Sequence, residues 1–162
     1  MLPTQVVYDP KGLVRQVIQT SQELKFTLLN IEEIDRLISK GLAYAEEVYR
    51  RVLRNELSFA QSQLDSLRWV LIQFDDYFQN SLPCSGFGSP SHFEQRGSKK
   101  LVEVLKLSYP LLEKSLILKA LGELLRFYQS QVIKLYDTLP LKRNKQTDLD
   151  WIDSLLELCE SI

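Results

Sequence analysis

A stripe of apolar residues along 54–78 constrains the fold more than any other feature of the sequence. The stripe recurs in alternating steps of three and four: Leu57, Ala60, Leu64, Leu67, Leu71, Phe74 and Phe78. An α-helix turns once per about 3.6 residues, so this spacing places all seven side chains on one face. A helix of this length cannot keep such a face in water. The sequence therefore predicts that other helices cover it.

Similar apolar periodicity recurs along most of the chain, which has 162 residues and is 44% hydrophobic. We expect further helices over 10–26, 31–52, 101–107 and 111–139, and a last one from 148 onwards. Pro110 and Pro140 break the pattern, and the Ser, Gly and Pro residues of 80–100 predict a long loop. The predicted fold is all-α: a single-domain, up-and-down bundle of about five helices, with an extended arm over 1–9.

Several residues mark where these helices begin. Asp9 precedes Pro10, which suits the first turn of a helix. Asn30 and Glu33 have the spacing of a capping box, in which each side chain bonds the other residue's backbone. Asp148 is the predicted cap of the last helix. Gly41 interrupts the second helix, which indicates either a close helix crossing or ligand approach, or a mild defect that packing tolerates.

The net charge and the cysteine content restrict the classes of partner and the compartment that we expect. The net charge is −1, so no overall field attracts nucleic acid or an anionic membrane. No apolar stretch approaches the roughly 20 residues that span a bilayer, and the start of the chain does not have the pattern of a signal peptide. Cys84 and Cys159 lie far apart, as in a reduced cytoplasmic protein. We expect no partner of either kind, nucleic acid or membrane.

Candidates for chemistry are few. His92 is the only histidine and has no ligand pattern around it, so neither a metal nor another cofactor is expected. Glu46 and Glu47 are weak catalytic candidates, because a helix carboxylate facing a cleft can act as a general base. Beside Arg50 and Arg51, a solvated helix face is the simpler interpretation of these two residues.

Asp75 and Asp76 form an acidic end to the helix over 54–78. The pair suits a cationic ligand such as an aminoglycoside, or else an exposed helix terminus. Acidic groups at a helix C-terminus oppose the helix dipole, which draws attention to them.

Two stretches resemble a known family. VVYDPKGLVRQVIQT, over 6–20, is similar to the exit from the catalytic domain of kanamycin- and lincosamide-type nucleotidyltransferases. RNELSFAQSQLDSLRWVLIQF, over 54–74, resembles the long helix of their C-terminal bundle, with Asn55 where that family commonly has glycine.

The resemblance implies a helical domain that shapes an acceptor pocket and often mediates dimerisation. The family's Gly-Ser signature and Asp-x-Asp pair, which bind nucleotide and metal, belong to a separate domain and have no counterpart here. Aligning on Tyr44 and Ala45 places Ala43 where the kanamycin type has its general base. The resemblance also gives the strand signal at Val6 and Tyr8 a role as a sheet edge that pairs with another domain or polypeptide.

Two functions follow as hypotheses. The first is a substrate-binding or accessory module that binds a small-molecule acceptor or a nucleotidyltransferase catalytic domain or chain and does not catalyse alone. Its cleft lies between the second helix and the helix over 54–78, lined by Tyr44, Glu47, Arg51 and Arg68. The second is a helical interaction protein, homodimeric or antitoxin-like, with no small ligand. It predicts an apolar surface left over after the bundle closes.

Overall fold

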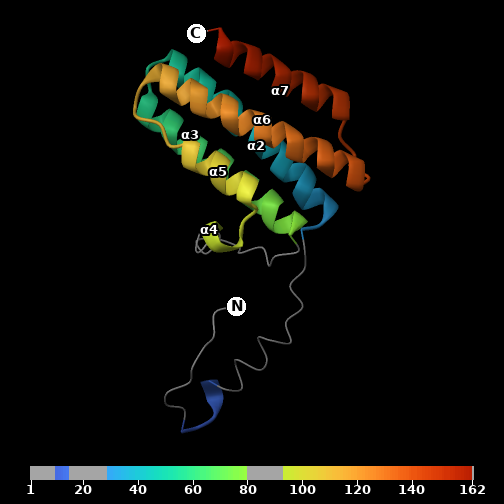
Figure 1. The fold of residues 1–162 in the computed structure, drawn as a ribbon. Coiled ribbons are helices and arrows are strands. Elements are labelled where there is room, and N and C mark those ends of the chain that lie inside the picture. Colours follow the sequence, from blue (N-terminus) through green and yellow to red (C-terminus); the bar gives the residue numbers. More distant parts are fainter. Residues whose placement is uncertain (1–9, 15–28, 80–92, 162) are drawn as a thin grey trace.

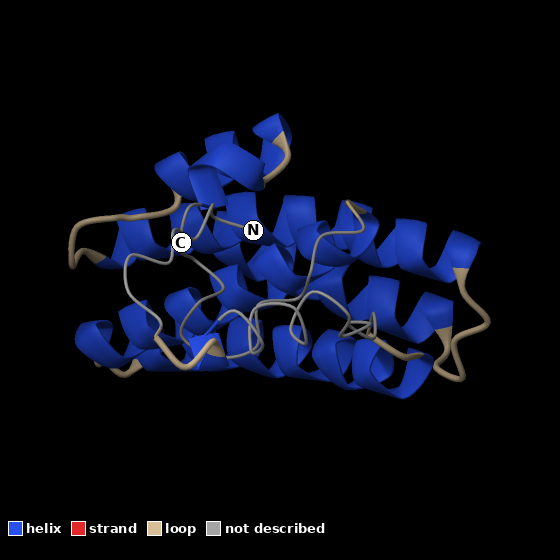
Figure 2. Cartoon of the chain, turned by 90° about the horizontal axis from the view of Figure 1, so that it is seen from below, coloured by secondary structure: helices blue, strands red, loops and turns tan. Residues whose placement is uncertain are grey.

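The computed structural model describes residues 10–14, 29–79 and 93–161. The predicted arm over 1–9, most of the first predicted helix, Cys84 and His92 lie outside the described residues. Within them the chain forms six labelled helices and no strand (Figures 1 and 2). The helices are α2 (Ile31–Leu53), α3 (Leu57–Phe78), α4 (Phe93–Arg96), α5 (Lys99–Leu107), α6 (Lys114–Thr138) and α7 (Lys145–Glu160).

The long helices run alternately up and down, which confirms the predicted all-α bundle (Figure 1). α6 lies at its centre and packs against α2, α3, α5 and α7. Its predicted stripe is buried throughout: Ile117, Leu121, Leu124, Leu125, Tyr128, Val132 and Leu135. The central position therefore belongs to α6. The apolar stripe over 54–78 belongs to α3, which packs against α2, α5 and α6.

That stripe is buried where α3 packs against α2 and α6. Ala60, Leu64, Leu67, Leu71 and Phe74 are fully buried. The ends of the stripe are half-buried, because they reach the limits of the bundle. α3 also buries a second face, which carries Arg68, Asp75 and Asp76 towards α4 and α5. The apolar pattern did not indicate this second face.

The interruption at Gly41 is a close helix crossing. The Tyr128 ring of α6 lies against Gly41 of α2, and a methyl group at that position would come within 2.5 Å of the ring. The Tyr128 hydroxyl donates to the carbonyl of Ile38 at 2.6 Å, and burial raises the pKa of Tyr128. Glycine at this position allows α6 to approach the backbone of α2.

The described helix ends follow the sequence signals with two exceptions. The first is the start of α6, which lies at Lys114 and not at the expected residue 111. Asn30 and Glu33 form the predicted capping box, and α6 ends two residues before Pro140. Asn55 adopts a φ of 63° in the turn from α2 to α3, a conformation that asparagine tolerates better than most residues. The expectation for Asp148 was wrong: Asn144 caps α7. Asp148 lies one turn inside the helix and is buried.

Most of the described part of the predicted loop, residues 93–100, is helical. α4 and the start of α5 lie in it, so these eight residues do not form an irregular loop. Asp75 accepts from the backbone of Ser98 at 2.8 Å, and Asp76 forms an ion pair with Arg96 of α4. Both carboxylates are buried. They hold α4 and the start of α5 against α3, so Asp75 and Asp76 are not an exposed helix terminus.

Over the residues that the structure places, no helix is both long and apolar enough to cross a bilayer.

Candidate interaction surface

The connection between α5 and α6 exposes an unusual amount of apolar surface. We call residues 107–112, LSYPLL, the apolar connection. Four large side chains are more than half exposed: Leu107 at 74%, Tyr109 at 63%, Leu111 at 70% and Leu112 at 55%. No charged residue interrupts them. Scattered exposed apolar side chains are ordinary, but a contiguous group of this kind usually marks a contact surface.

The apolar connection is fixed in place by Arg68, which reaches it from α3. The Arg68 side chain is almost fully buried. Its Nε atom donates to the Ser108 hydroxyl at 2.9 Å, and its Nη2 atom donates to the Ser108 carbonyl. The guanidinium also lies 3.9 Å from the centre of the Tyr109 ring. These contacts hold the backbone of the connection against α3 while its apolar side chains face solvent.

Burial of the charged Arg68 side chain costs desolvation free energy, and the Asp65 carboxylate offsets only part of that cost. Burial lowers the pKa of Arg68, and the carboxylate of Asp65 acts in the opposite direction. Asp65 accepts from Arg68 at 2.5 Å and is half exposed. A buried cation of this kind is costly unless its hydrogen bonds are satisfied. We conclude that the contacts to Ser108 are essential to the placement of the connection.

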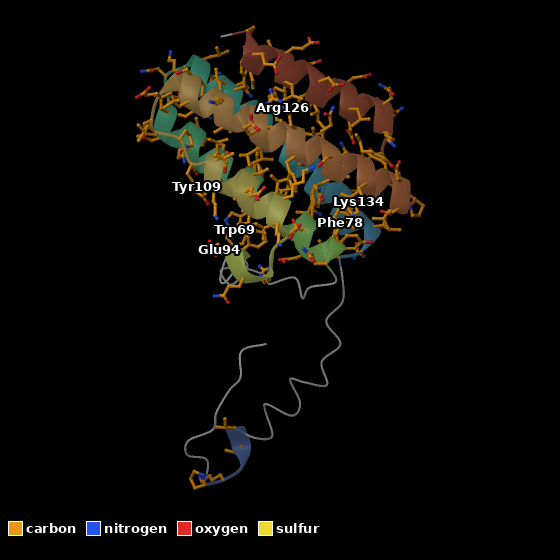
Figure 3. The ribbon with its side chains drawn as sticks, in the orientation of Figure 1. Trp69, Phe78, Glu94, Tyr109, Arg126 and Lys134 are labelled. Carbon is orange, nitrogen blue, oxygen red and sulfur yellow. The ribbon has the colours of Figure 1, made fainter. Side chains whose placement is uncertain are left out.

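A shallow apolar groove of about 200 Å³ adjoins the apolar connection. Its walls come from α3, α4 and α5, and Tyr109 belongs both to the groove and to the connection. Two exposed residues of opposite charge, Glu94 of α4 and Lys106 of α5, lie at its rim. Figure 3 shows Tyr109, Trp69 and Glu94 on the same side of the bundle. The remaining lining is apolar: Ile72, Phe93, Val102 and Leu105.

The sequence-predicted site residues separate into two groups. Glu47 and Arg51 do lie together on α2, with Arg51 donating to Glu47 at 2.6 Å and pairing with Glu56 in the turn to α3. Hydrogen bonds with Glu56 and Glu47 raise the pKa of Arg51, and Arg51 lowers the pKa of Glu56. Arg51 also lies 4.2 Å from the centre of the Phe59 ring. The charged side chains of Glu47, Arg51 and Glu56 are thus paired with one another.

Arg68 belongs to a different cluster from this turn. Its partners are Ser108, Tyr109 and Asp65. The partners of Arg51 are a different set: Glu47, Glu56 and Phe59. Tyr44 is half-buried and packs against the core. The structure therefore brings Glu47 and Arg51 together but places Arg68 elsewhere.

Glu46 lies in a second groove, between α2 and α7. The groove has a volume of about 380 Å³ and is lined by Ala43 and Glu46 of α2 and by Trp151 of α7. Arg143 and Asp148 form its polar side, with an Arg143 Nη2 to Asp148 Oδ1 distance of 2.6 Å. The hydrogen bonds and charge of Asp148 raise the pKa of Arg143. Glu46, one of the two weak catalytic candidates, thus lines this groove.

The apolar connection was not among the candidates that the sequence predicted. A signal existed, because LSYPLL carries four large apolar residues around a proline. The helical pattern of the flanking segments masked it, since leucines at 111 and 112 also fit the start of a helix. α6 starts only at Lys114. These leucines therefore lie outside the helix and are not part of its buried face.

No group of three His, Cys, Asp or Glu side chains suited to a metal ion occurs among the described residues. In comparisons with known proteins, no family model and no curated protein matches this chain.

Proposed function

We propose that this protein is a helical interaction protein that forms a homodimer through the apolar connection. The observation that carries the proposal is the exposure of Leu107, Tyr109, Leu111 and Leu112 on a segment that Arg68 holds rigid. Binding by such a segment costs little conformational entropy, because its backbone is ordered beforehand.

The chemistry of the connection favours a second copy over a transient partner. Homodimer interfaces are more apolar than transient ones, and their centres are depleted in charge. Residues 107–112 contain no charge at all. Aromatic residues are also enriched at interfaces, and Tyr109 lies in the middle of this segment. A homodimer would bury the apolar side chains of the connection, which the bundle of a single chain leaves exposed.

The test is the mass of the purified chain in solution, measured by multi-angle light scattering over a dilution series. We expect twice the chain mass of 18.9 kDa at high concentration. The double variant Leu111→Ser, Leu112→Ser should have the monomer mass at every concentration tested. A wild-type chain that is monomeric throughout would refute the proposal.

Ile133→Ser provides the matched control. Ile133 is also an exposed apolar residue, but it precedes Lys134 towards the opposite end of α6 (Figure 3). We expect this variant to dimerise like wild type. Equal loss of dimer in both variants would show that general surface polarity, and not the connection, sets the oligomeric state.

A second proposal rests on the groove between α2 and α7. We propose as the alternative function a substrate-binding or accessory module, similar to the C-terminal domain of kanamycin- and lincosamide-type nucleotidyltransferases. Glu46 and Trp151 line a groove of a size that admits a small molecule. Arg143 and Asp148 neutralise one another there, which leaves Glu46 as the carboxylate available to an acceptor.

This second proposal predicts association with a nucleotidyltransferase catalytic domain encoded in the same genome. Light scattering of the mixture should give a mass above that of either component, and adenylyl transfer by the mixture should fall with Glu46→Gln. Glu157→Lys, an exposed change on α7, serves as the control. A mixture that shows no complex and no transfer would reject the alternative.

A further inference from the structure

We infer that the groove beside Tyr109 forms part of a two-fold interface, in which Lys106 of one copy pairs with Glu94 of the other. The inference rests on the proposed homodimer and specifies its geometry. It concerns charged residues that the apolar connection itself does not contain.

A two-fold interface must be complementary to itself, because each copy presents the same surface. Like charges that face each other across the two-fold axis oppose association. Opposite charges stabilise the dimer, and each such contact occurs twice, once on either side of the axis. Glu94 and Lys106 meet this requirement. They lie at the rim of one groove, come from different helices and have opposite signs.

Both side chains are available for a partner. Glu94 and Lys106 are exposed, and in the described part of the chain neither forms an ion pair within 4.0 Å. This sets them apart from the charged residues of the turn between α2 and α3, where Arg51 already holds Glu47 and Glu56. In a dimer whose two-fold axis passes between these two residues, Glu94 of each copy faces Lys106 of the other.

In the proposed dimer, the apolar lining of the groove forms the buried surface between the two Glu94–Lys106 pairs. Phe93, Val102 and Leu105 form its floor beside Tyr109, and Tyr109 continues directly into Leu111 and Leu112. The groove and the apolar connection therefore form one continuous surface. An apolar centre with a charged rim is the usual anatomy of a stable interface.

Charge reversal tests the pairing. Lys106→Glu and Glu94→Lys each place like charges across the axis at two symmetric positions, so each should weaken dimerisation by about tenfold or more. The double variant carrying both changes restores opposite charges and should dimerise within about threefold of wild type. Sedimentation equilibrium measures the dissociation constants, and added salt should reduce the difference between the variants.

Lys40→Glu and Glu157→Lys are the matched controls, because both reverse an exposed charge on other helices. They should leave the dissociation constant unchanged, and at concentrations where the chain is monomeric all variants should retain the wild-type thermal midpoint. Dimers that persist in both single reversals, or a double variant that does not recover, would overturn the pairing while the homodimer stands. A monomeric wild-type chain would overturn both.

Discussion

The two connections that flank α6 both contain leucines beside a proline, but they differ in whether those leucines are buried. Residues 107–113 lead into α6 and residues 139–144 lead out of it, and each contains leucines beside a proline. Before α6, Leu111 and Leu112 are exposed. After α6, Leu139 and Leu141 pack against the core. Hydrophobic composition alone thus does not decide whether a connection is buried.

An arginine fixes each connection, but the direction of the anchor differs. Arg68 reaches outward from α3 to hold Ser108. Arg143 belongs to the second connection and reaches inward to Asp148 and Ser39. The leucines beside the inward anchor pack against the bundle. The outward anchor contacts the Ser108 carbonyl and hydroxyl groups and the Tyr109 ring of the first connection. The leucines that follow remain in solvent.

The largest predicted effect comes from the outward anchor. Arg68→Ala should lower the free energy of unfolding by about 3 kcal/mol, because it removes a buried side chain and leaves the buried Ser108 carbonyl without this donor. Urea denaturation at several protein concentrations separates this loss from any effect of dimer dissociation. Asp65→Asn is the control, with an expected cost below about 1 kcal/mol because Asp65 is half exposed. Equal costs would contradict the anchoring role of Arg68.

The inward anchor should matter less. Arg143→Ala should cost about 2 kcal/mol, since Arg143 is a quarter exposed and Asp148 keeps its hydrogen bond from Tyr136 at 2.5 Å. The same urea experiment measures the loss. Lys142→Ala, an exposed neighbour, should be neutral. If Arg143→Ala costs more than Arg68→Ala, the ranking of the two anchors is wrong.

A matched pair of leucine substitutions tests the comparison directly. Leu141→Ser should lower the free energy of unfolding by about 1.5 kcal/mol, because it removes a half-buried apolar side chain. Leu111→Ser should change the stability of the monomer by less than about 0.5 kcal/mol, as its side chain contacts mainly water there. Denaturation at concentrations where the chain is monomeric gives both values. Similar losses would mean that the two connections do not differ in burial as described.

Much of the bundle was predictable because its helices have regular apolar periods. The capping box at Asn30, the breaks at Pro110 and Pro140 and the buried stripe of α6 follow local rules that operate within a few residues. The crossing at Gly41 was one of two readings, and only the position of Tyr128, 87 residues later, selects it.

The candidate surface was harder to predict, because it depends on contacts between distant residues. Arg68 and Ser108 are 40 residues apart, and nothing near Arg68 in the sequence indicates that its charge is buried. Asp75 and Asp76 raise the same difficulty, since their burial depends on α4 and α5. A charged residue on a helix is usually solvated, so periodicity assigns it to the outer face. Only tertiary packing shows which of these residues are anchors.

The smallest predicted effect concerns the ring that covers Arg68. Tyr109→Leu should lower the free energy of unfolding by about 0.5–1 kcal/mol, because it removes the contact between the guanidinium and the aromatic face. Tyr109→Phe retains that face and should remain within a few tenths of a kcal/mol of wild type. Urea denaturation of the monomeric chain distinguishes the two. Equal losses would assign the contribution to the Tyr109 hydroxyl, and the outward anchor would then rest on Ser108 alone.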